Sequence, residues 1–207
     1  IDVRLVGSEM CIRDSGNIYS RLGNPTVGAL EARLTALEDG AMCVALSSGT
    51  SAVMYSLINI MSQGDNFVTA NQLYGGTYTM FDNILPEYGI NSKKVDITDF
   101  EAVESAIDEK TRAIYCETIT NPGLVVADIS ALAETAHSKG IPLIVDATFT
   151  TSAILKPFEF GADIVVYSLT KWMSGHGRVI AGAVIEKGGF DWGNGNFPLY
   201  DKPDTSY

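Results

Sequence analysis

The sequence has few basic residues, few cysteines and no long apolar run. Its 207 residues contain 14 Lys and Arg against 25 Asp and Glu, which gives a formal net charge of −11. Because nucleic-acid phosphates and anionic lipid head groups would be repelled over most of such a surface, we expect no nucleic-acid partner and no membrane partner. No apolar run in the sequence approaches the roughly 20 residues that cross a bilayer as a helix.

The three cysteines give no support for a disulfide framework or a zinc site. Cys11, Cys43 and Cys116 are odd in number and far apart, and no two of them have metal-ligand or CxxC spacing. Cys43 and Cys116 stand in short apolar runs, where we expect buried and unreactive thiols. This cysteine usage fits a reducing compartment, so the predicted location is the cytoplasm.

The composition is that of a globular protein, but the two ends depart from it. With 46% hydrophobic and 19% charged residues, the chain can form one domain with a sizeable core. Residues 1–15 have neither helical nor strand periodicity and resemble a translated sequencing adaptor, so no native structure is predicted for them. The chain lacks an initiator methionine and stops in mid-pattern. We therefore interpret it as an internal fragment of a longer enzyme.

From residue 16 onward, short apolar runs alternate with helical periods. Strands are predicted at 42–46, 67–70, 92–95, 113–117, 143–146, 164–167 and 180–185. Helices are predicted at 25–40, 51–61, 78–85, 99–107 and 130–139. Because the strands are apolar on both sides and separated by helices, they indicate an α/β fold with a mixed, mostly parallel sheet and helices on both faces.

Polar residues follow several of the predicted strands. They are Ser47–Gly49, the loop that begins at Tyr74, Glu117 with Asn121, Asp146, and Ser168–Lys171. In an open α/β sheet, ligands bind outside the carboxyl ends of the strands. The sequence therefore predicts that these residues line one rim of the sheet and form a binding site.

Three of these positions point to a particular chemistry, and each also has an ordinary interpretation. The turn Ser48–Thr50 opens a helix and would present backbone N–H groups to a phosphate, unless it is a plain strand-to-helix turn. Asp146 at a buried strand end needs a strong donor such as a protonated pyridine nitrogen, unless it caps a helix or binds a metal. Lys171 at a buried strand end suits Schiff-base chemistry, whereas a lone lysine usually lies in solvent. Ser168 and Thr170 alternate with Lys171, so their hydroxyls would face a phosphate.

Four motifs, in this order and spacing, resemble the Cys/Met-metabolism family of pyridoxal-phosphate enzymes, which has fold type I. They are Tyr19-Ser-Arg21-x-x-Asn-Pro-Thr26, Leu73-Tyr-Gly-Gly-Thr77, Val145-Asp-Ala-Thr-Phe149 and Ser168-Leu-Thr-Lys-Trp-Met-Ser-Gly-His-Gly177. The resemblance covers 16–207. It implies that 16–40 are the remnant of an N-terminal arm and first helix, that 41–190 form the large domain that binds pyridoxal phosphate (PLP), and that 191–207 begin a loop toward a missing C-terminal domain.

The resemblance also implies a role for individual residues. Lys171 matches the lysine that holds PLP and shuttles protons, Asp146 the partner of its pyridine nitrogen, and Tyr74 the aromatic that stacks on its ring and assists proton transfer. Tyr19 and Arg21 match residues that reach the cofactor of a neighbouring subunit, which implies a homodimer or homotetramer. The remaining matches, to contacts with the phosphate or the phenolic oxygen, are Ser48, Gly49, Thr50, Asn121, Ser168 and Thr170. We assign no catalytic role to His176 and expect it to pack behind the lysine loop, with Trp172 as a further packing residue.

The tail of the sequence narrows the reaction. The runs Gly189-Phe-Asp-Trp-Gly-Asn-Gly-Asn-Phe-Pro198 and Lys202-Pro-Asp-x-Ser-Tyr207 resemble the O-acetylhomoserine sulfhydrylase branch of the family. The implied reaction of this transferase is γ-replacement, in which O-acetylhomoserine and sulfide (or methanethiol) give homocysteine (or methionine) and acetate. Cystathionine γ-synthase and methionine γ-lyase, which share the cofactor residues, are the alternatives, and a non-catalytic protein of the same fold is a third. Without the C-terminal domain, we expect the 207-residue chain to be inactive by itself.

Overall fold

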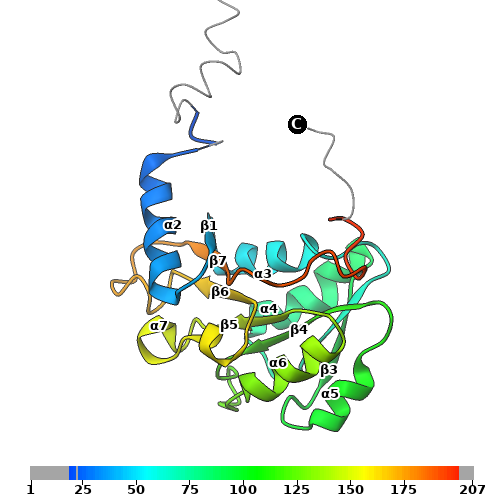
Figure 1. Ribbon diagram of the computed structural model, residues 1–207. Helices are drawn as coiled ribbons and strands as arrows, with labels where there is room; N and C mark the ends of the chain where they lie inside the picture. Colours follow the sequence, from blue (N-terminus) through cyan, green and yellow to red (C-terminus); the bar gives the residue numbers. More distant parts are fainter. Residues whose placement is uncertain (1–18, 22, 201–207) are drawn as a thin grey trace, which may run out of the picture.

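The computed structural model describes residues 19–21 and 23–200, which form a seven-stranded sheet with helices packed around it (Figure 1). The strand order across the sheet is β1-β7-β6-β5-β4-β2-β3. Neighbouring strands are parallel except at β7, which is antiparallel to both β1 and β6. The strands are β1 (Met42–Leu46), β2 (Asn66–Ala70), β3 (Asn91–Val95), β4 (Thr111–Glu117), β5 (Leu143–Asp146), β6 (Ile164–Ser168) and β7 (Gly182–Glu186). The prediction of a mixed, mostly parallel sheet is confirmed.

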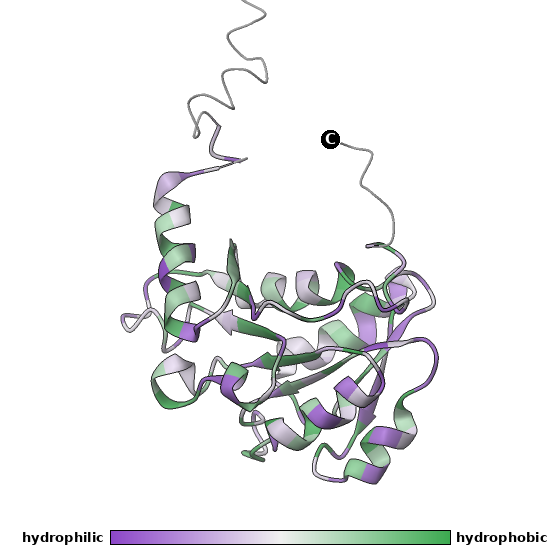
Figure 2. Ribbon diagram, in the orientation of Figure 1, coloured by the Kyte–Doolittle hydropathy of each residue, from purple (hydrophilic) through white to green (hydrophobic). Residues whose placement is uncertain are grey.

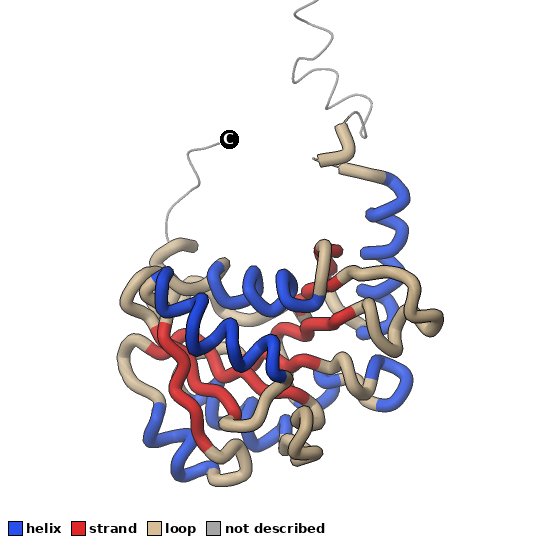
Figure 3. The backbone as a smooth tube through the Cα atoms, turned by 180° about the vertical axis from the view of Figure 1, so that it is seen from behind, coloured by secondary structure: helices blue, strands red, loops and turns tan. Residues whose placement is uncertain are grey.

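Helices cover both faces of this sheet, as predicted. The view in Figure 1 and the reverse view in Figure 3 place α3 and α4 on one face, and α5 and α6 on the other. The helices are α2 (Pro25–Glu38), α3 (Gly49–Ile58), α4 (Gly75–Thr79), α5 (Phe100–Ala106), α6 (Ile129–Ser138) and α7 (Thr151–Ile154). After α4 the chain continues through a π-helical turn (Met80–Ile84) and a 3-10 turn (Leu85–Tyr88), and a second 3-10 turn (Pro157–Phe160) follows α7. The short α7 and the 3-10 turn after it were not predicted.

The core lies on the two faces of the central strands. In Figure 2 the central strands are largely green, because they consist mainly of hydrophobic residues. Ile114, Ile144 and Val165, on three adjacent strands, are fully buried. Cys43 and Cys116 are buried free thiols, which confirms that expectation, whereas Cys11 lies outside the described residues. No helix in the described ranges is long and apolar enough to cross a membrane.

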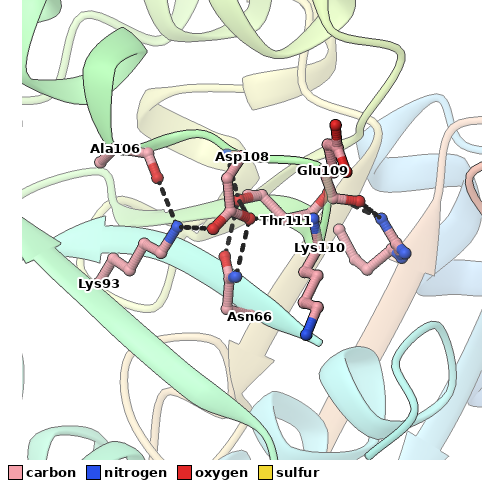
Figure 4. Close-up of polar contacts among 8 residues, drawn as sticks. Asn66, Lys93, Ala106, Asp108, Glu109, Lys110 and Thr111 are labelled. Carbon is pink, nitrogen blue, oxygen red and sulfur yellow. Dashed lines mark hydrogen bonds and ion pairs between the residues drawn. The ribbon is translucent and has the colours of Figure 1, made fainter. Parts of the chain in front are cut away.

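A polar cluster ties the amino ends of β2 and β4 together (Figure 4). The carboxylate of Asp108 accepts hydrogen bonds from Asn66 Nδ2 at 2.9 Å and from Lys93 Nζ at 2.6 Å. Thr111 Oγ1 donates to Asn66 Oδ1 at 2.7 Å. The hydrogen bond from Lys93, followed by that from Asn66, holds the pKa of Asp108 well below its usual range. At this end of the sheet the polar side chains therefore bind one another.

Candidate functional site

A cavity of about 660 Å³ opens at the carboxyl ends of β4, β5 and β6. Nine of the predicted site residues line it, which brings together segments more than 100 residues apart in the sequence. They are Ser48, Gly49, Thr50, Tyr74, Asn121, Asp146, Ser168, Thr170 and Lys171. The predicted convergence on one rim of the sheet is thus confirmed, while the role of each residue stays a prediction.

Two predicted residues lie elsewhere. Tyr19 and Arg21 precede α2, whose first turns project from the body of the molecule in Figure 1. Tyr19 is about half exposed, and the guanidinium carbon of Arg21 lies 5.1 Å from the centre of its ring. Neither residue lines the cavity of its own chain. This position agrees with the expectation that they serve another subunit, but it does not test that expectation.

The turn between β1 and α3 is built around its glycine and its serines. Ser48 Oγ accepts a hydrogen bond from Ser51 N at 3.1 Å, and Ser51 Oγ accepts one from Ser48 N at 2.9 Å. This reciprocal capping box begins the helix and leaves the N–H groups of Gly49 and Thr50 without an acceptor inside it. A Cβ atom at Gly49 would lie 2.5 Å from Ser168 Cβ, so only glycine allows the turn to approach β6 so closely. The result is a cradle of backbone donors at the positive end of α3.

The segment after β6 carries the predicted lysine out to the cavity mouth. The chain turns after Ser168, where Lys171 N donates to Ser168 O at 3.1 Å. Lys171 is therefore exposed, which corrects the expectation that it sits buried at a strand end. Ser168 N donates to Thr148 Oγ1 at 2.8 Å, and Thr170 Oγ1 accepts from Ala181 N at 3.1 Å. These two hydrogen bonds fix the backbone on either side of the turn.

Asp146 is the last residue of β5, and its side chain lines the cavity. Its Oδ1 accepts a hydrogen bond from Thr148 N at 2.9 Å, and its Oδ2 accepts a longer one from Tyr115 Oη at 3.3 Å. Burial raises the pKa of Asp146, although the hydrogen bonds from Thr148 and Tyr115 oppose this. No group of three His, Cys, Asp or Glu side chains in the described ranges could hold a metal ion. A partly buried carboxylate with a raised pKa in a cavity is suited to a cationic partner.

Glu117, the last residue of β4, holds two segments of the cavity wall. Its side chain is buried, with Oε1 accepting a hydrogen bond from Tyr74 N at 2.7 Å and Oε2 accepting one from Asn121 N at 2.9 Å. Burial raises the pKa of Glu117 to about 7, in spite of the hydrogen bonds from these two amides. The side chain of Tyr74 is about half exposed at the cavity.

The cavity mouth contains residues that were not predicted to belong to the site. Trp172, expected to pack in the core, is 67% exposed and lines the mouth with Phe149 and Ile180. His176, expected to pack behind the lysine loop, is also exposed there, and its Nδ1 accepts a hydrogen bond from Arg178 N at 3.1 Å. The glycines on both sides of His176 were the available signal, because such a run favours an irregular surface loop over a packed element.

Comparisons with known proteins show the family of this chain. The family model described as Cys/Met metabolism PLP-dependent enzyme matches residues 6–200. The O-acetyl-L-homoserine sulfhydrylase of Leptospira meyeri is 45% identical over 95% of this chain and 44% of its own length. The homocysteine synthase of Schizosaccharomyces pombe is 44% identical over 95% of this chain and 46% of its own length. The chain spans about half the length of the curated relatives it matches.

Solved structures show the same fold. A putative O-acetylhomoserine (thiol)-lyase from Campylobacter jejuni superimposes with a TM-score of 0.89 at 40% identity, over 93% of this chain and 48% of that protein. That structure contains N'-pyridoxyl-lysine-5'-monophosphate. The cystathionine gamma-lyase of Lactobacillus plantarum superimposes with a TM-score of 0.81 at 40% identity, over 86% of this chain and 46% of that protein.

Proposed function

We propose a sulfur-transfer function for this chain, which belongs to the Cys/Met metabolism PLP-dependent enzyme family. The whole protein replaces the acetoxy group on the γ-carbon of O-acetylhomoserine by sulfide or methanethiol. The products are homocysteine or methionine, together with acetate. The sulfhydrylases among its relatives support this reaction over the cystathionine γ-synthase and methionine γ-lyase alternatives. The observation that carries the proposal is the convergence of Lys171, Asp146 and the first turn of α3 on one cavity.

The residues of the cavity fit pyridoxal phosphate. The free N–H groups of Gly49 and Thr50 at the positive end of α3 suit its phosphate, as does the hydroxyl of Ser168. The partly buried carboxylate of Asp146 suits a protonated ring nitrogen, which would supply the cation that this carboxylate lacks. When bound, the cofactor supplies an electron sink that stabilises negative charge on the α-carbon of an amino acid.

The side chains around that position would orient the cofactor and move protons. Lys171 Nζ would hold the cofactor covalently and, once released by the substrate amine, take the proton from the α-carbon. Tyr74 would stack on the ring and assist proton transfer. Asn121 would contact the phenolic oxygen, while Ser48 and Thr170, whose hydroxyls already have partners in this chain, would shape the phosphate end.

We further propose that the assembled enzyme is a homodimer or homotetramer in the cytoplasm. Tyr19 and Arg21 would then complete the cofactor site of the neighbouring subunit, which is consistent with their exposed position before α2. The free, buried thiols of Cys43 and Cys116 are consistent with a reducing compartment.

The reaction can be tested on the purified whole protein loaded with pyridoxal phosphate. Supplied with O-acetylhomoserine and sulfide, it should release homocysteine and acetate in equal amounts. Supplied with methionine alone, it should release little 2-oxobutyrate and ammonia. Efficient elimination from methionine would replace this proposal by a γ-lyase, and formation of cystathionine with cysteine as the preferred acceptor would replace it by a γ-synthase.

A further inference from the structure

The buried side chain of Glu117 joins the two walls of the cavity that flank β4. One wall is the Tyr74 segment, which lies between β2 and α4, and the other is the Asn121 segment, which follows β4. The two carboxylate oxygens of Glu117 each accept a hydrogen bond from a backbone N–H, one from Tyr74 at 2.7 Å and the other from Asn121 at 2.9 Å. When Glu117 is ionised, above its raised pKa, these are charge-assisted hydrogen bonds, which are about twice as strong as neutral ones.

We propose that Glu117 is a positioning residue, whose carboxylate places Tyr74 and Asn121 against the bound cofactor. The inference rests on the proposed function, because it takes these two residues to contact the cofactor ring and its phenolic oxygen. It assigns to Glu117 no contact with the cofactor and no proton transfer.

The position of Glu117 in the sheet explains why it can join these segments. Glu117 and Asp146 are register partners at the ends of the adjacent strands β4 and β5. The end of β4 is therefore held rigidly beside the end of β5, where Asp146 stands. A carboxylate fixed at that point, and 5% exposed, transmits the rigidity of the sheet to the backbone amides of Tyr74 and Asn121.

The geometry also shows what the loss of this carboxylate would do. Tyr74 precedes the first residue of α4, so its N–H has no acceptor inside that helix. Asn121 follows the last strand residue by four positions, and its N–H bonds to the side chain of Glu117 rather than to a neighbouring strand. Without Glu117, both amides would need water or a shift of the loop to satisfy them. A shift of either loop moves a predicted cofactor contact.

A buried carboxylate elsewhere in the chain provides a matched control. Asp163, before β6, is 7% exposed, and its Oδ2 accepts a hydrogen bond from Leu143 N at 2.8 Å and lies 2.9 Å from His137 Nε2. It is thus also a buried acid that holds a backbone amide of the same sheet. It does not line the cavity, however. Asp163→Asn should therefore destabilise the fold without changing the affinity for pyridoxal phosphate or its absorbance spectrum.

The first experiment measures amide hydrogen exchange in the whole protein without cofactor. In Glu117→Ala, exchange at Tyr74 and Asn121 should accelerate about ten- to a hundredfold, which corresponds to the loss of a hydrogen bond to a charged group. Amides in the centre of β5, such as Ile144, should keep their protection and show that the sheet is folded. Glu117→Gln, which keeps one acceptor oxygen, should show a smaller acceleration. Unchanged exchange at both amides in Glu117→Ala would overturn the proposal.

The second experiment measures the binding and the absorbance of pyridoxal phosphate. In Glu117→Ala the dissociation constant for pyridoxal phosphate should rise about tenfold, with a shift in the pH midpoint of its absorbance, and Glu117→Gln should fall between this variant and the wild type. If Asp163→Asn changes these quantities as much as Glu117→Ala does, Glu117 has only a structural role. The two proposals fail separately. If the spectrum of Glu117→Ala is altered but the wild type catalyses no γ-replacement, the proposed reaction alone is contradicted. If Glu117→Ala catalyses normal γ-replacement and its spectrum is unaltered, the positioning role alone is contradicted.

Discussion

At the amino ends of β2 and β4, Asn66 and Asp108 are hydrogen-bonded to each other, whereas at the carboxyl ends of β5 and β6, Asp146 and Lys171 face a cavity. Both ends of the sheet carry polar side chains at strand termini. At the amino end, the hydrogen bond from Lys93 leads the causes that lower the pKa of Asp108. At the carboxyl end, burial leads the causes that raise the pKa of Asp146.

This difference distinguishes a structural polar cluster from a binding site. A carboxylate whose partners are all in the chain is stabilised in its charged form, and the fold gains from it. A partly buried carboxylate that has no cationic partner in the chain is suited to a ligand that supplies one. At the carboxyl end of the sheet, the raised pKa of Asp146 points to a ligand site because its side chain also lines the cavity.

The largest effect is expected at the carboxyl end from Lys171→Ala. Because Lys171 is exposed, the variant should fold, but it should lose the near-visible absorbance of covalently held pyridoxal phosphate completely on dialysis. Absorbance spectra before and after dialysis, with borohydride reduction, measure this. Lys187→Ala, at another exposed lysine, should keep the absorbance. A borohydride-reducible adduct in Lys171→Ala would contradict the assignment of Lys171 as the residue that holds pyridoxal phosphate.

A smaller effect is expected from the titration of Glu117. Its pKa is raised from 4.5 to about 7 in the folded protein, so between these values the folded state binds more protons than the unfolded chain. The free energy of unfolding should therefore fall as the pH rises through this range, by about 3 kcal/mol from this group. The contribution is fully present below pH 4.5 and is lost as the pH passes about 7.

Urea unfolding of the cofactor-free protein between pH 4 and pH 8, roughly the span of this titration, would measure it. The difference between wild type and Glu117→Gln isolates this group from Asp146, whose raised pKa acts in the same direction. Parallel pH profiles for the two proteins would show that burial of Glu117 does not control its titration.

The smallest effect is expected at the amino end from Asp108→Ala. This substitution removes the acceptor of Asn66 and Lys93, and it should lower the free energy of unfolding by about 1–2 kcal/mol because the side chain is partly exposed. Denaturant unfolding measures the loss, with the exposed neighbour Glu109→Ala as a control. The affinity for pyridoxal phosphate should not change. A weaker affinity would mean that the two ends of the sheet are coupled, which would break the comparison.

Much of the fold and of the site could be predicted because the signals are local. Each predicted strand is found within two residues of its expected ends, since runs of apolar residues bounded by turns are typical of buried strands. The residues after those strands meet at one edge because parallel strands end on the same side. This is why Asn121, Asp146 and Ser168 were expected to lie together, and the structure confirms it.

Other features were not predictable, since they depend on contacts between distant segments. Trp172 is a large aromatic residue of a type common in packed cores, yet the chain around it leaves the sheet after Ser168 and places it at the cavity mouth. The exposure of Lys171 has the same cause. The roles proposed for Tyr19 and Arg21 require a second subunit, which the order of residues in one chain does not place.

What the sequence by itself determined is the set of strands, most of the helices, the polar residues at the strand ends and the family they resemble, because each is encoded within a few neighbouring residues. Only the tertiary structure decided that β7 runs antiparallel between β1 and β6. It also decided that Glu117 reaches back to the amide of Tyr74, 43 residues earlier in the chain. Strand order and such hydrogen bonds follow from how hydrophobic faces pack across the whole domain, and no local pattern records that packing.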